Sequence, residues 1–372
     1  MRRRGGSGTG PGLPQTGWEV FSMRALLVVL LSAVAVLTSC SSLEGAKTES
    51  ILSKGEFLSV AADKNVPCVM LRNTQTNKLV LAAYKAQTGW TPVDCSAVAE
   101  GSDLMGFAVG DNVPYLLLKS TSTSKLSLAA YSDTARWMSV DCTPVADGAD
   151  LVGFAASNGA PYLLFKAAPT GKLTLATYND LTKWKVIDCS PAAESSELMG
   201  FTVGFNVPYL LLKSKTTGRV SLATCDSLAH WTSTDCAAAA EGAELVGFGA
   251  GDHAPFMLFR DTSTGKLTLG FSNILANRVS GTPVADNSQL LGFAVGNDAP
   301  YMVLKAASGK LTIVSYNILT NFFSSTRVAE NSEYLGLAAG SRTPYMVLKA
   351  STGKLVLTMY NASYGWQNVV IE

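Results

Sequence analysis

The chain has 372 residues, with 29 lysines and arginines against 28 aspartates and glutamates, so its formal net charge is +1. That balance excludes the basic excess expected of a nucleic-acid-binding protein. Hydrophobic residues make up 47% of the sequence and charged residues 15%. Such a composition suits a long chain that buries a large core as one domain.

The amino-terminal 40 residues carry a targeting pattern. Residues 1–22 are rich in arginine and glycine, and Met23 and Arg24 then precede an apolar run and the sequence Leu-Thr-Ser-Cys that ends at Cys40. This order resembles a bacterial lipoprotein signal peptide, in which a base, a short apolar segment and small residues precede a cysteine. The resemblance implies that residues 1–39 are removed and that Cys40 is lipidated. An uncleaved anchor and an ordinary secretory signal are the alternatives. A separate hypothesis is that residues 1–22 are a mis-called start and that Met23 is the initiator, with Met1 as the alternative.

A lipid at Cys40 implies an envelope protein whose membrane partner is reached through the anchor. Residues 40–55 would form a polar tether, and Ser41 and Ser42 imply delivery to the outer membrane of a two-membrane cell. Without residues 1–39 the chain keeps 29 − 4 = 25 bases and 28 − 1 = 27 acids, a net charge of −2.

From residue 56 onwards the sequence repeats one unit seven times, and residues 151–197 are a representative copy. A proline marks the second strand of each unit, with intervals of 47, 47, 47, 47, 45 and 44 residues between successive copies. These prolines are Pro67, Pro114, Pro161, Pro208, Pro255, Pro300 and Pro344.

Each unit contains four short apolar or alternating runs separated by turn residues, and no run of ten residues has a helical period. Four antiparallel strands per repeat are typical of a β-propeller blade. The sequence therefore predicts an all-β, seven-bladed β-propeller over residues 56–372, and it resembles only this broad class. The predicted blades are 56–102, 103–149, 150–196, 197–243, 244–288, 289–332 and 333–372. A solenoid or a sandwich fits the repeat less well.

The strands of a unit have distinct roles in this prediction. The first run contains glycine, as in the LVGF sequence at 151–154, and is expected to be innermost, where strands crowd the axis. The second run is apolar on both faces and is expected in the middle of the blade.

Charged residues recur at one rim of the predicted ring. A base ends the second strand and another opens the third, while an acid precedes the first strand in six of seven units. This rim either captures a partner or forms exposed ion pairs, each of which contributes about 0–1 kcal/mol.

The opposite rim gathers aromatic and amide side chains that suit a ligand. A flat ring covers apolar patches of a sugar or peptide, while asparagine and aspartate bond its polar groups. The alternative is that the rings fill gaps between blades. The candidate ligand residues are Asp111, Asn112, Tyr131, Trp137, Tyr178, Trp184, Trp231 and Trp366, and Tyr316 with Phe322 is a variant of the repeated aromatic pair.

The sequence offers little for catalysis. His230 and His253 lie in different loops without metal-ligand spacing, and no phosphate-binding or nucleophile motif is present. We therefore predict no catalytic residue, no metal and no cofactor. Four cysteines recur every 47 residues and are expected to be buried free thiols, with disulfides as the alternative if they line the axis: Cys95, Cys142, Cys189 and Cys236.

Taken together, these features predict a lipid-anchored, non-enzymatic binding module for a protein or glycan ligand at the cell envelope. An outer-membrane assembly scaffold and a glycan hydrolase or lyase are the alternatives. The fifth and sixth units are shorter and carry Arg278 where tryptophan is expected, which predicts a partner site at residues 273–283.

Overall fold

A computed structural model describes residues 52–371. The exceptions are residues 147, 169, 180–182, 227–228, 237–241, 253, 274–277, 286–287, 298, 318–321, 329–331 and 362–364. The predicted signal peptide, the lipidation site Cys40 and most of the tether therefore lie outside the described residues, as does His253. None of the helices in the part of the chain described is long and apolar enough to cross a membrane.

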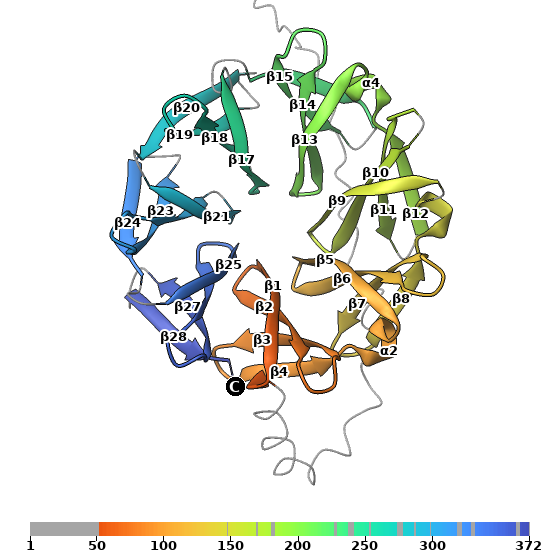
Figure 1. Cartoon of the computed structure of the whole chain (residues 1–372). Helices are drawn as coiled ribbons and strands as arrows, with labels where there is room; N and C mark the ends of the chain where they lie inside the picture. Colours follow the sequence, from red (N-terminus) through yellow and green to blue (C-terminus); the bar gives the residue numbers. More distant parts are fainter. Residues whose placement is uncertain are drawn as a thin grey trace, which may run out of the picture. The chain divides into compact units, whose positions relative to one another are not determined.

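Seven four-stranded antiparallel sheets stand around a central axis and confirm the predicted seven-bladed β-propeller (Figure 1). Each sheet consists of four consecutive strands in sequence order. The first strand of every blade is innermost, as predicted (Figure 1). These strands are β1 (Gly55–Asp63), β5 (Ser102–Gly110), β9 (Ala149–Ser157), β13 (Ser196–Gly204), β17 (Ala243–Ala250), β21 (Gln289–Val295) and β25 (Glu333–Ala339).

The remaining strands follow outwards. The second strands are β2 (Val66–Asn73), β6 (Val113–Ser120), β10 (Ala160–Ala167), β14 (Val207–Ser214), β18 (Pro255–Asp261), β22 (Pro300–Lys305) and β26 (Pro344–Lys349). The third strands are β3 (Leu79–Lys85), β7 (Leu126–Ser132), β11 (Leu173–Asn179), β15 (Val220–Cys225), β19 (Leu267–Asn273), β23 (Leu311–Asn317) and β27 (Leu355–Asn361). The outer strands are β4 (Gly89–Asp94), β8 (Arg136–Asp141), β12 (Lys183–Asp188), β16 (Trp231–Asp235), β20 (Arg278–Ala285), β24 (Phe322–Arg327) and β28 (Gly365–Val370).

The second strands form the core because both of their faces meet a neighbouring blade. In β10, for example, five consecutive residues from Pro161 to Phe165 are buried. The buried hydrophobic residues group into seven clusters, and each cluster joins two adjacent blades. The hydrophobic core is therefore a ring of seven interfaces, which explains why the apolar content is so high.

The inner strands share a bulge that lets adjacent blades pack closely. One residue in each is skipped in the pairing with the second strand, and the following position is usually glycine. A side chain at Gly106 would lie 2.6 Å from the ring of Phe154 in the next blade, and Gly153 stands in the same relation to Phe201. Glycine is needed at these positions because the neighbouring phenyl ring occupies the space of a Cβ.

The ring closes between blades one and seven without a shared sheet. The first blade comes entirely from the amino-terminal end of the domain and the seventh from the carboxyl-terminal end. They are joined by a buried cluster that includes Val69 and Val347, and by a 2.9 Å hydrogen bond from Trp90 Nε1 to the Val370 carbonyl.

Short helices join some of the blades, and the sequence did not predict them. They are α2 (Ser96–Ala99), α3 (Thr143–Ala146) and α4 (Ser190–Ala193). Each is a single turn, which is too short to produce a helical hydrophobic pattern over ten residues. The Asp141 carboxylate accepts 2.8 and 2.6 Å hydrogen bonds from the Thr143 amide and hydroxyl, which lower its pKa and start α3.

Candidate functional site

The propeller has two rims, defined here by their loops. The first-loop rim holds the turns that join the first to the second strand, and the third to the fourth strand, of each blade. The second-loop rim holds the turns between the second and third strands and the connections to the next blade. A cleft of ligand-binding size opens at the first-loop rim, so the site is built from the ends of strands that meet there.

The first loops surround a small axial cavity of about 110 Å³ that residues from all seven blades line. Three backbone hydrogen bonds join four of the neighbouring loops around it. Asp252 N donates to Asn297 O at 2.5 Å, Asn297 N to Ser341 O at 3.2 Å, and Ser341 N to Lys64 O at 2.6 Å. These bonds link blades five, six, seven and one.

Side chains make the corresponding links among the earlier blades. Asn112 N donates to Asp63 Oδ2 at 3.1 Å, and the Lys64 ammonium pairs with the Asp111 carboxylate. The predicted ligand residues Asp111 and Asn112 thus join blade two to blade one. Asn206 N likewise donates to Ser157 Oγ at 3.2 Å, between blades four and three.

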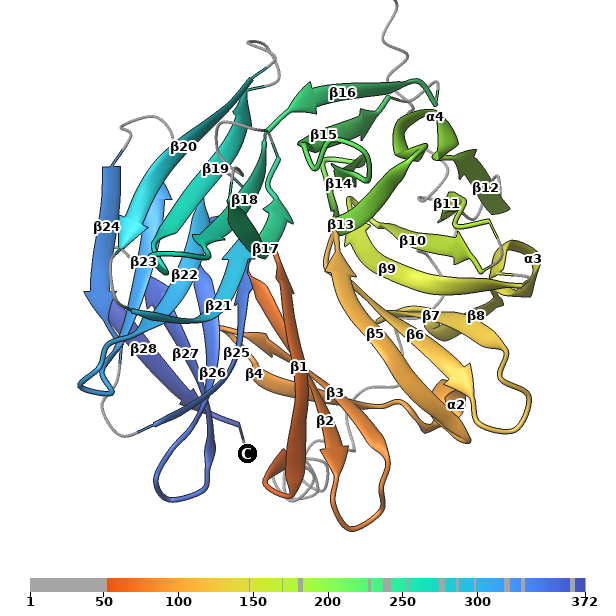
Figure 2. The same ribbon diagram turned by 45° about the horizontal axis from the view of Figure 1, so that its top comes forward.

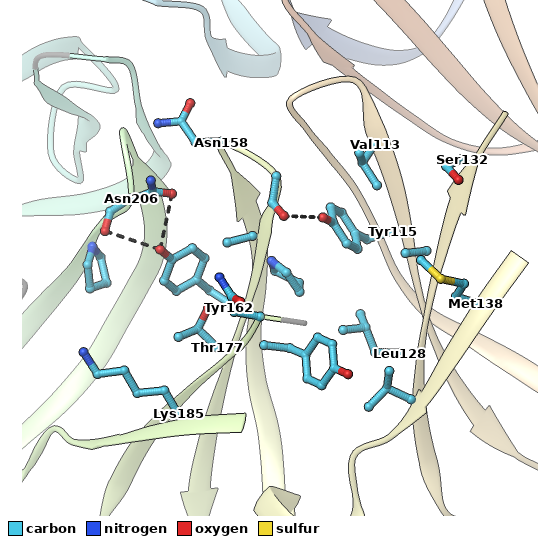
Figure 3. Close-up of a pocket in the computed structure, with 18 of the residues that line it drawn as sticks. Val113, Tyr115, Leu128, Ser132, Met138, Asn158, Tyr162, Thr177, Lys185 and Asn206 are labelled. Atoms are coloured by element: carbon cyan, nitrogen blue, oxygen red, sulfur yellow. Dashed lines mark hydrogen bonds between the residues drawn. The ribbon is translucent and has the colours of Figure 1, made fainter. Parts of the chain in front are cut away.

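The main cavity is a cleft of about 660 Å³ at the ends of blades two, three and four (Figure 3). It is called the inter-blade cleft below. Its walls include Tyr115 from β6, Tyr131 from β7, Tyr162 from β10 and Tyr178 from β11. Its volume falls within the range of about 300–1,000 Å³ that is usual for ligand pockets.

The cleft tyrosines are held by hydrogen bonds across the blades. Tyr115 Oη donates to Gly159 O at 2.5 Å, and Tyr162 Oη lies 3.4 Å from both the backbone and side-chain oxygens of Asn206 (Figure 3). Burial raises the pKa of Tyr162, so the hydroxyl remains a donor at neutral pH. The rings are therefore fixed walls of the cleft.

Two charged residues, Lys185 from β12 and Asp226 just after β15, lie on the blade-four side of the cleft. Asp226 also holds the β15–β16 turn, because its carboxylate accepts a 2.8 Å hydrogen bond from the His230 amide and lies 3.3 Å from His230 Nδ1. The histidine is exposed, as predicted for a surface residue.

The structure divides the predicted aromatic residues into two groups. Tyr131 and Tyr178 line the cleft, whereas three of the tryptophans bond to the preceding blade of the ring. Trp137 Nε1 donates to Asp94 O at 2.9 Å, Trp184 Nε1 to Asp141 O at 3.0 Å, and Trp231 Nε1 to Asp188 O at 2.9 Å. The alternative interpretation, that these rings fill gaps between blades, therefore describes the tryptophans.

Trp366 occupies the same position in blade seven but lacks the bond. Its indole N–H is buried and has no hydrogen-bond partner among the described residues. Its ring lies 5.2 Å from that of Tyr360, the same centroid distance as between Tyr131 and Trp137. Trp366 therefore keeps the contact with the tyrosine ring but lacks the indole hydrogen bond.

The aromatic pair of blade six is shifted by one residue from the predicted one. Tyr316 is in register with Phe323, and their ring centroids are 4.8 Å apart. Phe322 instead faces Asn317 in the register, so the predicted pairing with Phe322 is wrong. In this shorter repeat the spacing from the third-strand tyrosine to its fourth-strand partner differs from that in the other blades. A prediction that assumes constant spacing therefore selects the wrong phenylalanine.

Exposed ion pairs occupy the second-loop rim. In blade three the base that opens the third strand, Lys172, lies 2.9 Å from Asp188, and in blade four Arg219 lies 3.8 Å from Asp235. Each pair joins two strands of one blade and is at least half exposed, so each contributes about 0–1 kcal/mol. The bases are among those predicted, but their partners lie at the end of the fourth strand of the same blade and not before the first strand.

The cysteines of the described chain provide no nucleophile. All six are free and buried, which confirms the predicted thiols at Cys95, Cys142, Cys189 and Cys236 and excludes the disulfide alternative. Desolvation raises the pKa of these four thiols to about 12, so they remain protonated at neutral pH.

Sequence reasoning missed half of the cleft. Tyr115 and Tyr162 follow the repeated proline and were treated only as strand residues, and Met138 was not singled out. A signal was available, because five of the seven second strands begin with Pro-Tyr. A buried tyrosine at a strand end points its hydroxyl to the rim, where it meets the loops.

Comparison with known proteins concerns the fold. No family model and no curated protein matches the sequence. Among solved structures, a prolyl endopeptidase is similar with a TM-score of 0.61 and 10% identity over 87% of this chain, and the match spans only 50% of that protein. The β-propeller domain of the Trilobed protease from Pyrococcus furiosus is similar with a TM-score of 0.60 and 5% identity, over 86% of this chain and 96% of that one. Puromycin hydrolase is similar with a TM-score of 0.59 and 10% identity, over 87% and 55% of the two chains.

These similarities correct the function predicted from the sequence. Similar solved structures include a prolyl endopeptidase, an acylaminoacyl peptidase and puromycin hydrolase. They contradict the prediction of a non-enzymatic binding module and the prediction that the chain is not an enzyme. The sequence contains no motif that signals this relation, and identities of 5–10% establish similarity of fold only.

Proposed function

We propose that this chain is the propeller part of a peptide hydrolase and that its ring controls which peptides reach the hydrolytic groups. The observation that carries the proposal is the extent of the structural match. The same ring makes up about half of a prolyl endopeptidase and nearly all of the propeller domain of the Trilobed protease.

The hydrolytic groups are proposed to come from another domain or polypeptide. The protonated, buried thiols cannot attack a carbonyl carbon. His230 and Asp226 form a histidine–carboxylate pair, but it stabilises an exposed turn. Hydrolysis would break the C–N bond of a peptide and add water, with OH going to the carbonyl carbon and H to the amine. The ring would contribute access and positioning to that reaction.

The test is a hydrolysis assay on the assembly that forms in the cells that produce the chain. Full-length tagged protein is recovered in mild detergent and assayed with succinyl-Ala-Ala-Pro-Phe p-nitroanilide, alongside recombinant protein alone. We expect hydrolysis by the recovered assembly and labelling of an accompanying polypeptide by a fluorophosphonate probe. Absence of hydrolysis and of labelling in every fraction that contains the chain would refute the proposal.

We also propose that the chain is anchored to the outer membrane through a lipid on Cys40. The support is the Leu-Thr-Ser-Cys sequence after a short apolar run, with Ser41 and Ser42 following. Two or more acyl chains give stable anchoring, because each buried CH₂ contributes about 0.8 kcal/mol. A Cys40→Ala variant should lose labelling by radioactive palmitate and leave the membrane fraction. Retention of both would exclude lipidation at this residue.

A further inference from the structure

The walls of the inter-blade cleft are apolar although tyrosines make them. The hydroxyls of Tyr115 and Tyr162 are engaged by Gly159 and Asn206, and that of Tyr131 lies 3.2 Å from Arg136 Nη1. These three tyrosines line the cleft but are at most 9% exposed, so with their hydroxyls engaged they contribute mainly ring carbons to its wall. Ring carbons favour apolar groups and offer no donor that would select a charged one.

The polar groups around these walls are mostly neutral. Asn158, Asn179 and Asn206 each provide an amide that both donates and accepts hydrogen bonds. The two charged groups, Lys185 and Asp226, have opposite signs, so they offer no excess charge for an ionic ligand to neutralise. Amides that both donate and accept match the alternating N–H and C=O groups of a peptide backbone.

Beside the cleft, the sequence of blade four departs from that of its neighbours. Cys225 stands in register with Trp231 just as Tyr178 stands with Trp184. Cys225 is buried and does not itself line the cleft, but the next residue, Asp226, does. A phenol ring is much larger than a thiol, so a tyrosine at position 225 would bring added bulk next to this wall.

Exposed apolar side chains extend the surface beyond the cleft. Met138 on β8 is 45% exposed and lines the cleft directly. Phe205 is 62% exposed, lines the axial cavity and precedes Asn206 of the cleft. Asn158 lines both cavities, so the two form one continuous surface at the first-loop rim.

Phe205 is also conformationally unusual. Its φ is +47°, and the equivalent turn positions of the first three blades hold Lys64, Asp111 and Asn158 at φ between +45° and +51°. A bulky aromatic residue in the left-handed region is a genuine outlier, whereas asparagine and aspartate adopt it readily. An exposed phenyl ring kept at such a position points to a role in contact with a ligand.

We infer that the inter-blade cleft, extended by Phe205, binds an extended, uncharged peptide segment through its apolar side chains. This inference rests on the proposed function and names its substrate class. Met138 and Phe205 contact apolar side chains at the two ends of the surface, and the three asparagines bond the peptide backbone. The surface selects against charged peptides because burial beside the tyrosine rings removes the hydration of a charge, and this desolvation is costly.

The experiment measures binding by fluorescence anisotropy with purified full-length protein. The probe is a fluorescein-labelled peptide amide, Ala-Pro-Phe-Ala-Leu, and the comparison probe has glutamate in place of phenylalanine and leucine. We expect the first peptide to bind at least tenfold more tightly than the second. Met138→Asp should weaken binding of the first peptide at least tenfold, and Phe205→Asn several-fold.

Val186→Asp is the matched control, because Val186 is an apolar residue 54% exposed on the next outer strand and does not line the cleft. It should bind as the unaltered protein does. Cys225→Tyr provides a second test, since it restores the residue of the neighbouring blades and should reduce binding by adding bulk next to the cleft wall. Circular dichroism and thermal unfolding establish that each variant is folded.

Equal binding by Met138→Asp and Val186→Asp, or equal affinity for the two peptides, would overturn the inference. Binding is measured without hydrolysis, so its outcome is separate from that of the proposed function. Selective binding without hydrolysis in any assembly would leave the cleft assignment standing and remove the hydrolase. Hydrolysis that is insensitive to Met138→Asp would support the hydrolase proposal and remove the cleft as its peptide site.

Discussion

In blades one to four, the indole N–H of each outer-strand tryptophan donates to a carbonyl of the preceding blade, as Trp184 does to Asp141. From blade five to blade one, adjacent blades are instead joined at the axis by backbone hydrogen bonds between first loops, as Asp252 joins Asn297. The junction of blades seven and one, where the two ends of the ring meet, carries both kinds of bond. Figure 2 shows these two halves of the ring side by side.

The difference explains where the cleft lies. Where backbone bonds join the loops directly, little space is left between them. Between blades two and four the loops are held by tyrosine hydroxyls and an asparagine side chain, which span a longer distance and leave a cavity. The regular half of the repeat therefore holds the candidate site, whereas the sequence placed a partner site in the irregular half, at residues 273–283.

The largest expected effect on stability comes from truncating a phenylalanine buried between blades, because both halves of the ring are packed in this way. Phe165 in blade three and Phe259 in blade five are both fully buried between blades. Phe165→Ala and Phe259→Ala should each lower the free energy of unfolding by about 3–5 kcal/mol, because each leaves a cavity. Urea denaturation measures both. A loss in only one of them would show that the halves differ in packing as well as in hydrogen bonding.

The tryptophan bonds are tested by removing the indole N–H and keeping a ring. Trp184→Phe loses the bond to Asp141, whereas Trp366→Phe removes a buried N–H that has no partner among the described residues. Both variants lose similar ring area, so the difference between them reports the hydrogen bond. Trp184→Phe should be less stable than Trp366→Phe by about 1–3 kcal/mol. Equal losses would mean that the indole bonds do not hold the regular half together.

The buried thiols give the regular half a distinctive pH dependence. Desolvation raises the pKa of Cys142 from 9.0 to about 12, so above pH 9 the unfolded chain releases a proton that the folded chain keeps. The contribution to stability is complete below pH 9 and is lost as the pH rises towards 12. Between pH 8 and pH 10 the unaltered protein should lose on the order of 1 kcal/mol more than Cys142→Ala. Urea denaturation at both pH values measures this, and an identical pH dependence would show that the thiol is solvated.

The smallest effect concerns the turn at Phe205. Phe205→Asn places a residue that tolerates the left-handed conformation at φ +47°, and it should raise the free energy of unfolding by up to about 1 kcal/mol. Thermal unfolding measures the gain, with Asn158→Ala as the opposite change at the equivalent turn. A loss of stability in Phe205→Asn would mean that the ring contributes packing to the folded protein.

The sequence was sufficient to predict the fold because seven copies of one pattern fix the strands and their order. Prolines at constant spacing marked the second strands, and glycine in the first runs marked the axis. The site depends on contacts with neighbouring blades, and these contacts are not visible in the repeated sequence pattern. Tyr115 and Tyr162 resemble their counterparts in other blades, and the links between loops make their surroundings a cleft.

Of the eight candidate ligand residues, only Tyr131 and Tyr178 line the cleft, and their role in binding a ligand stays a prediction. Three of the tryptophans that appeared equivalent form bonds between blades instead. The arrangement of the blades decides which residue of an aromatic pair contacts the neighbouring blade. The periodicity of the sequence alone does not reveal this arrangement.

The most direct test of the peptide site is photo-cross-linking. An uncharged peptide that carries benzoylphenylalanine in place of phenylalanine is irradiated with the full-length protein, and the attached residues are mapped by mass spectrometry. The account predicts attachment to residues of blades two to four at the first-loop rim, with Met138 and Tyr178 among them. Attachment confined to blades five to seven, or to the second-loop rim, would contradict it.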